Sequence, residues 1–215
     1  MKLLLENWKN FLAEEKQYQI YCDMDGVLVD FVAGVVDKIM ADIDDPSIPT
    51  HKPTGGILPM GRLRQALEDQ GQDTIDASYF GIEKSSDPVK KAVKNYMYKA
   101  IGDDRHFWAT LPWMPEGKQI WDMIKDHDPF ILTSPMGSES QLGKQDWIDA
   151  NLSPIPRQVF FSHEKYEHAA PNHILIDDFL NKNITPFRAA GGVGIHHVDI
   201  SETLKELANY IGDAK

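Results

Sequence analysis

The segment YQIYCDMDGV, residues 18–27, combines a strand-like run with an acidic turn. Its first five residues are mostly apolar or aromatic, which is typical of a short β-strand. Asp23 and Asp25 follow directly, and Gly26 favours a turn of the chain. As the chain leaves a strand, carboxylates two residues apart can point into the same crevice. We therefore expect a functional site at the carboxyl end of this strand.

Four further runs share this form, because each is short, apolar and followed by polar residues. They lie at 129–133, 158–161, 173–176 and, more weakly, 193–196. Nearly continuous apolar runs are typical of parallel strands that are buried on both faces. Helical patterns lie between them, at 117–126 and 140–151. The alternation predicts an α/β fold with a Rossmann-like, doubly wound parallel sheet, which binds its ligands at the carboxyl ends of the strands.

Residues 34–106 interrupt the strand–helix alternation. They include Pro/Gly-rich stretches and two helical patterns, at 62–70 and 88–100. We interpret this segment as a small, mostly helical cap inserted after the first strand. The predicted domains are therefore an α/β core, formed by residues 1–33 and 107–215, and a helical cap at 34–106.

Charge and composition exclude several classes of function. The chain has 215 residues and a formal net charge of -11, which argues against a nucleic acid polymer or an anionic membrane surface as a partner. The single cysteine, Cys22, excludes an intramolecular disulfide and fits a reducing compartment. No apolar run approaches the roughly 18 residues that a membrane span needs, so we expect a cytoplasmic protein. Residues 2–16 predict an amphipathic helix that either covers the core or mediates a homodimer.

The acidic residues at two strand ends are candidates for a metal site. Asp177 and Asp178 follow the run 173–176, as Asp23 and Asp25 follow the first strand. Close carboxylates repel each other unless a cation lies between them, and oxygen ligands beside a phosphate suit Mg²⁺. One carboxylate can then attack phosphorus while another protonates the leaving oxygen. The alternative is that both pairs belong to ordinary Asp-rich turns.

Phosphate binding would draw on the ends of the other strands. Thr133 and Ser134 offer hydroxyl groups and backbone N–H groups after the second run. Lys165 follows the third run, and Lys144 lies at the start of the helix after the second. Each feature also has a plain interpretation, a turn before proline for the first pair and solvated lysines for the second.

The order of these motifs resembles that of the haloacid dehalogenase (HAD) phosphohydrolases. The matching elements are DMDGVL at 23–28, a strand ending in Thr133, a lysine, and IDD at 176–178. Within that superfamily the chain looks most like the 5′(3′)-deoxyribonucleotidases, on the segments DMDGVLVDF, ILTSP, LIDD and the loop 107–117. The cap shows little that can be aligned with that family.

The resemblance implies a role for each acidic residue. Asp23 would be the nucleophile that forms an aspartyl-phosphate, and it would also bind Mg²⁺. Asp25 would be the general acid and base, and its backbone carbonyl would be a metal ligand. Asp178 or Asp177 would complete the Mg²⁺ site.

The resemblance also implies contacts with the substrate. Thr133 would hydrogen-bond the phosphate, with Ser134 beside it. Lys165 matches the phosphate-binding lysine of the family best, and Lys144 is the runner-up. Phe31 matches an aromatic residue that packs against a nucleotide base.

These features predict a Mg²⁺-dependent phosphomonoester hydrolase, namely a 5′-nucleotidase of nucleotide metabolism that dephosphorylates (deoxy)nucleoside monophosphates. One alternative is a HAD phosphatase that acts on a phosphosugar or another small metabolite. A second is a non-catalytic HAD-like module that binds a nucleotide or a protein. The basic residues Lys90, Lys91, Lys94 and Lys99 form either a solvated helix face or a surface that attracts an anionic substrate.

Overall fold

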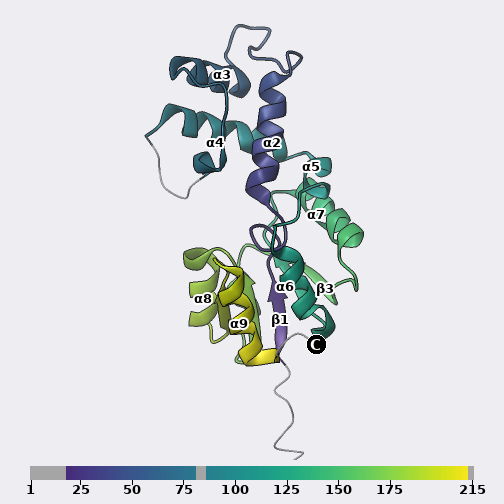
Figure 1. Ribbon diagram of the computed structural model, residues 1–215. Helices are drawn as coiled ribbons and strands as arrows, with labels where there is room; N and C mark the ends of the chain where they lie inside the picture. The colour runs from purple at the N-terminus through teal and green to yellow at the C-terminus, as the bar shows by residue number, and fades with distance from the viewer. Residues whose placement is uncertain (1–17, 81–85, 213–215) are drawn as a thin grey trace, which may run out of the picture. The chain divides into compact units, whose positions relative to one another are not determined.

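A computed structural model describes residues 18–80 and 86–212, which form two compact units (Figure 1). The sheet unit comprises Met1–Leu28, Glu116–Ser134 and Ser153–Lys215, and the helical unit comprises Val29–Pro115 and Pro135–Leu152. The helix predicted at 2–16 lies outside the described residues. The predicted boundaries of the cap, at 34 and 106, stay a prediction.

The sheet unit is built on five parallel strands in the order β3-β2-β1-β4-β5. The strands are β1 (Gln19–Cys22), β2 (Phe130–Thr133), β3 (Gln158–Phe161), β4 (His173–Asp177) and β5 (Val193–His196). All five predicted strands are confirmed, and the parallel α/β fold is confirmed with them. β1 lies at the centre of the sheet, so its carboxyl end has a neighbouring strand end on each side.

Alternation along the three central strands, β2, β1 and β4, buries both faces of the sheet there. Tyr21, Leu132 and Leu175 point to one face and join a buried cluster with Ile184 and Phe187. The residues between them are also fully buried, and they include Ile20, Cys22, Ile131, Ile174 and Ile176. Because neither face meets water along β1, β2 and β4, these strands have nearly continuous apolar sequences, and this is why they could be predicted.

Short helices complete the sheet unit. They are α6 (Gly117–Ile124), η2 (Lys125–His127), η3 (Lys165–His168), η4 (Leu180–Ile184), α8 (Thr185–Ala189) and α9 (Ile200–Ile211). α8 packs against β5 and η4, and α9 packs against β5 and α6. η4 is a single π-helical turn, an element that is rare and often found near functional sites.

The helical unit contains the remaining described helices. They are α2 (Phe31–Asp44), α3 (Pro59–Asp69), η1 (Ala77–Phe80), α4 (Pro88–Ile101), α5 (Arg105–Ala109) and α7 (Ser138–Asn151). α4 packs against both α2 and α3, and α5 packs against α7 (Figure 1). The helical patterns predicted at 62–70 and 88–100 correspond to α3 and α4. α7 groups with this unit, although the sequence pattern assigned it to the core.

A buried polar cluster ties α2, α3 and α4 together. Tyr96 donates a 2.7 Å hydrogen bond to Asp42, which also pairs with Lys38 at 2.8 Å. The Arg64 guanidinium donates to the carbonyl groups of Ile43 and Asp45 at 2.8 Å. These bonds satisfy carbonyl groups that would otherwise lack partners where α2 ends.

No helix within residues 18–80 and 86–212 is both long enough and apolar enough to cross a membrane. The cytoplasmic location stays a prediction from composition.

Candidate active site

Pairing between β1 and β4 places two acidic residues side by side. Cys22 is in register with Ile176, and the backbone N–H of Asp23 donates to the Ile176 carbonyl at 2.9 Å. The ladder therefore continues one residue beyond β1. As a result Asp23 lies next to Asp177, the last residue of β4, at the carboxyl edge of the sheet.

Three carboxylates meet at this edge. Asp23, Asp177 and Asp178 each offer an oxygen, and these oxygens all lie within 4.8 Å of one another. Asp177 is fully buried and Asp23 nearly so, whereas Asp178 is exposed. The structure thus brings together three of the four acidic residues that sequence analysis placed at two separate strand ends, namely Asp23, Asp177 and Asp178.

Lys165 is the counter-charge of this cluster. It begins η3, after β3, and only 1% of its surface is exposed. Its Nζ lies 2.8 Å from Asp23 Oδ2 and 2.6 Å from Asp177 Oδ2. Burial disfavours the charged ammonium, but the two carboxylates outweigh burial and raise the pKa of Lys165. Lys165 therefore keeps its positive charge at neutral pH.

The charges of the cluster suit a divalent cation. When all three carboxylates are ionised, they and the Lys165 ammonium leave two surplus negative charges in a partly buried site. Carboxylate oxygens are also the ligands that Mg²⁺ prefers. Asp23, Asp178 and the backbone carbonyl of Asp25 could hold such an ion.

Asp177 is better suited to holding Lys165 than to binding a metal. Its Oδ2 accepts hydrogen bonds from Lys165 and from Asn183 Nδ2, the latter at 2.9 Å. Its Oδ1 accepts from Asn183 Nδ2 at 2.9 Å and from the Phe179 N–H at 2.8 Å. Both oxygens are thus already in hydrogen bonds, which leaves Asp178 as the better candidate for a metal ligand.

Asn183 is a site residue that sequence analysis missed. It is buried in η4, and both of its bonds to Asp177 come from the same amide nitrogen. The only signal in the sequence was a polar residue six positions after Asp177. That spacing does not match an α-helical turn, and the π-helical turn of η4 is what brings the amide back to the strand end.

Gly26 is required by the backbone and by its neighbour. Its φ is +74°, in a region that side-chain-bearing residues rarely adopt. A Cβ atom at this position would also overlap the Asp178 carboxylate. The turn after Asp25 can therefore approach Asp178 because residue 26 has no side chain.

The other site residues predicted in the sheet unit lie at the carboxyl ends of β1 and β2. Asp25 is half-buried in the turn after β1, and the Met24 N–H donates to Asp23 Oδ1 at 2.7 Å. Thr133 is fully buried at the end of β2. Ser134 follows it and donates from Oγ to the Ser162 carbonyl at 3.0 Å.

Lys144 and Phe31 belong to the helical unit. Lys144 is fully buried in α7, with its Nζ 5.1 Å from the centre of the Trp108 ring. Phe31 begins α2 and stacks on Trp108, with ring centres 5.5 Å apart and planes inclined by 19°. Their roles as substrate contacts stay predictions.

The surroundings of Asp178 raise the pKa of its carboxyl group. Loss of hydration among the surrounding atoms, followed by the charges of Asp23 and Asp177, raises the pKa of Asp178 to about 7. The folded protein therefore binds a proton at Asp178 more tightly than the unfolded chain does. Stability that comes from this proton is present at low pH and is lost as the pH rises toward 7.

We expect this titration to be visible in the metal-free protein. In EDTA, the melting temperature of the wild type should fall relative to that of Asp178→Asn between pH 5 and pH 8. Mg²⁺ should reverse the fall, because it binds the deprotonated carboxylate. Thermal unfolding followed by circular dichroism measures both effects. Parallel profiles for the two proteins would contradict the shifted pKa.

Comparisons with proteins of known structure identify the fold. No protein-family model matches the chain, and no curated protein matches its sequence. A haloacid dehalogenase-like family hydrolase from Xanthomonas campestris superposes with a TM-score of 0.51 at 12% identity, covering 93% of this chain and 94% of that one. The chain has the fold of the HAD-like hydrolases.

Other solved structures are similar at lower scores. A Bacillus subtilis protein described as a HAD hydrolase bound to magnesium has a TM-score of 0.49 at 14% identity, covering 91% of this chain and 99% of that one. An L-2-haloacid dehalogenase from Xanthobacter autotrophicus has a TM-score of 0.46 at 15% identity, covering 89% and 82%.

Proposed function

We propose that the protein is a Mg²⁺-dependent phosphomonoesterase that works through an aspartyl-phosphate. The observation that carries this proposal is the Asp23 carboxylate, which follows the central strand, pairs with Lys165 at 2.8 Å and lies beside the carboxylates of Asp177 and Asp178. The HAD-like fold supports a hydrolase, and the surplus negative charge supports a divalent metal.

The side chains divide the reaction into two displacements. Asp23 attacks phosphorus, the ester P–O bond breaks, and Asp25 gives its proton to the leaving oxygen. Asp25 then takes a proton from water, whose oxygen attacks phosphorus and breaks the bond to Asp23. Inorganic phosphate leaves, and both aspartates return to their starting states.

The remaining groups act on charge and position. Lys165 holds Asp23 in place and offers positive charge to the phosphate oxygens. Thr133 and Ser134 can donate hydrogen bonds to the same oxygens. Mg²⁺, when bound by Asp23, Asp178 and the Asp25 carbonyl, would neutralise the negative charge shared by phosphate and cluster.

A (deoxy)nucleoside 5′-monophosphate is our proposed substrate. The support is the resemblance of the sequence around Asp23, Thr133 and Asp177 to deoxyribonucleotidases. The same resemblance matches Phe31 to an aromatic residue that packs against a nucleotide base.

A panel of substrates tests this function. Phosphate release would be measured from deoxynucleoside and ribonucleoside 5′-monophosphates, glucose 6-phosphate and p-nitrophenyl phosphate, each with Mg²⁺ and with EDTA. Halide release from a 2-haloacid would be measured alongside. We expect kcat/KM for the best nucleotide to exceed that for the sugar phosphate by about tenfold or more. EDTA should reduce turnover to background.

Each other outcome of the panel is informative. A preference for the sugar phosphate would contradict the nucleotide assignment and leave the mechanism standing. Halide release without phosphate release would identify a dehalogenase instead. Absence of both products over hours, with nucleotide binding retained, would identify a binding module rather than an enzyme.

A further inference from the structure

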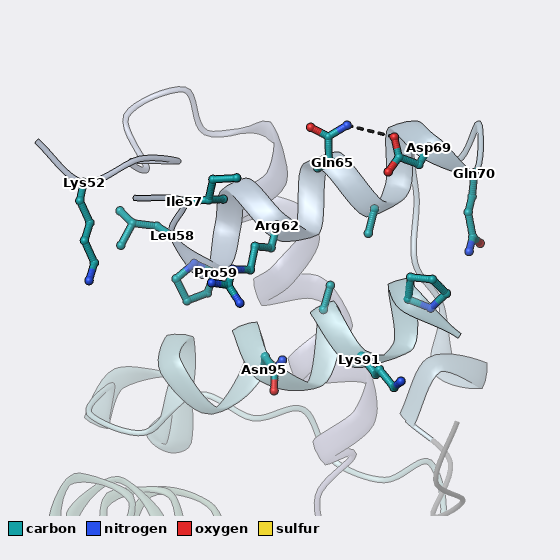
Figure 2. A pocket seen from close by; sticks show the side chains of 13 residues that line it. Lys52, Ile57, Leu58, Pro59, Arg62, Gln65, Asp69, Gln70, Lys91 and Asn95 are labelled. Atoms are coloured by element: carbon teal, nitrogen blue, oxygen red, sulfur yellow. Dashed lines mark hydrogen bonds between the residues drawn. The ribbon is translucent and has the colours of Figure 1, made fainter. Parts of the chain in front are cut away.

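The helical unit contains a groove between α3 and α4 that the proposed reaction does not use. Figure 2 shows α3 lying along one side and α4 along the other. The groove encloses about 730 Å³, within the range of about 300–1,000 Å³ that is usual for small-molecule sites. Every residue that lines it belongs to the helical unit.

Positive charge dominates the rim of this groove. Lys52, Arg62 and Lys91 line it, and Arg62 reaches from α3 toward α4 (Figure 2). Among the lining residues that the structure describes, Asp69 is the one carboxylate, and it accepts a 3.0 Å hydrogen bond from Gln65. Within the described part of the chain, the three basic side chains form no ion pair and no hydrogen bond.

The floor of the groove is apolar. Leu58 and Ala66 of the α3 side are half-buried, and Ala92 of α4 is buried. Gln65 and Asn95 are polar residues that also line the groove. A bare inorganic ion would leave the apolar surface unused, whereas an organic anion would cover it.

We propose that this groove binds a nucleotide-sized organic phosphate as a second ligand site. The rim carries two surplus positive charges, which match the charge of about −1.5 to −2 on a phosphate group at neutral pH. Arg62 offers the planar donor pair that suits phosphate oxygens, and Lys52 and Lys91 add point charges. The organic body of the ligand lies on Ala66 and Ala92. Binding at this site needs no metal.

Calorimetric titration tests the site on the full chain. ADP would be titrated in EDTA into Asp23→Asn, a variant that prevents turnover and leaves the groove untouched. We expect one ADP per chain, with weaker binding of inorganic phosphate and of adenosine. Higher salt should weaken the binding of ADP.

Further substitutions in the Asp23→Asn background distinguish binding of ADP in the groove from non-specific attraction to basic residues. Arg62→Ala and Lys91→Ala should each lower the affinity for ADP by about tenfold or more, because each removes a charge-assisted contact. Ala66→Phe should do the same by filling the floor. Lys94→Ala is the matched control, because Lys94 is exposed on α4 but does not line the groove.

The proposal fails if ADP does not bind, or if the groove variants bind it as tightly as Asp23→Asn alone. It also fails if Lys94→Ala weakens binding as much as Lys91→Ala, because that result indicates non-specific attraction. The titration does not depend on catalysis, so failure of the proposed phosphatase activity would leave its outcome unchanged.

Discussion

Asp23→Asn should lower kcat for phosphate release by about 10³-fold or more while the protein still folds. The amide has nearly the shape of the carboxylate but cannot attack phosphorus as a nucleophile. Its oxygen can still accept the hydrogen bond from the Met24 N–H, and Lys165 keeps its 2.6 Å ion pair with Asp177. Steady-state kinetics on p-nitrophenyl phosphate and thermal unfolding measure the two effects.

The metal affinity of the same variant gives a second measurement. Loss of one negative charge should weaken Mg²⁺ binding without abolishing it, because Asp178 and the backbone carbonyl of Asp25 remain. Asp126→Asn is the matched control, since it makes the same chemical change at an exposed position of the sheet unit. Wild-type turnover by Asp23→Asn would rule out the aspartyl-phosphate mechanism.

The sheet could be predicted because its signals are local. Each strand is a short apolar run, and both faces of the three central strands are buried, so their pattern does not depend on which residues face one another. The polar ends of β1 and β4 could be placed at one edge because parallel strands end on the same side. The fold class and the meeting of Asp23 with Asp177 both follow from this reasoning.

Sequence alone could not predict that Asp177 holds Lys165 whereas Asp178 is the better candidate for a metal ligand. Successive residues point in different directions, and the register between β1 and β4 decides which carboxylate faces Lys165. The same limit applies to Lys165 and Lys144, which are both buried and both follow strands. Only the tertiary arrangement shows that Lys165 pairs with Asp23.

Asn183 and the groove were beyond prediction for a related reason. Asn183 reaches Asp177 through the π-helical turn of η4, whose spacing leaves no periodic signal. The groove depends on how α3 packs against α4, and its basic residues come from three separate parts of the sequence. Sequence analysis noted the lysines of α4 but could not indicate that Lys91 and Lys94 differ in position.

Lys165→Met should both destabilise the protein and remove its activity. Methionine has a similar length, but it leaves the buried carboxylates of Asp23 and Asp177 without their shared counter-charge. Breaking a buried ion pair on one side costs about 3–5 kcal/mol, because the remaining charge stays desolvated. Urea unfolding in EDTA measures this loss, and Lys182→Met, at an exposed lysine of η4, is the control.

A second substitution separates stability from catalysis. Asp177→Asn in the Lys165→Met background removes one of the stranded carboxylates, so it should restore a large part of the lost free energy of unfolding. It should not restore turnover, because the positive charge beside Asp23 and the phosphate is still missing. Recovery of both would mean that Lys165 serves only the fold. Recovery of neither would mean that the ion pair with Asp177 is not what stabilises this strand end. Recovery of stability alone is the result that a lysine acting on the phosphate requires.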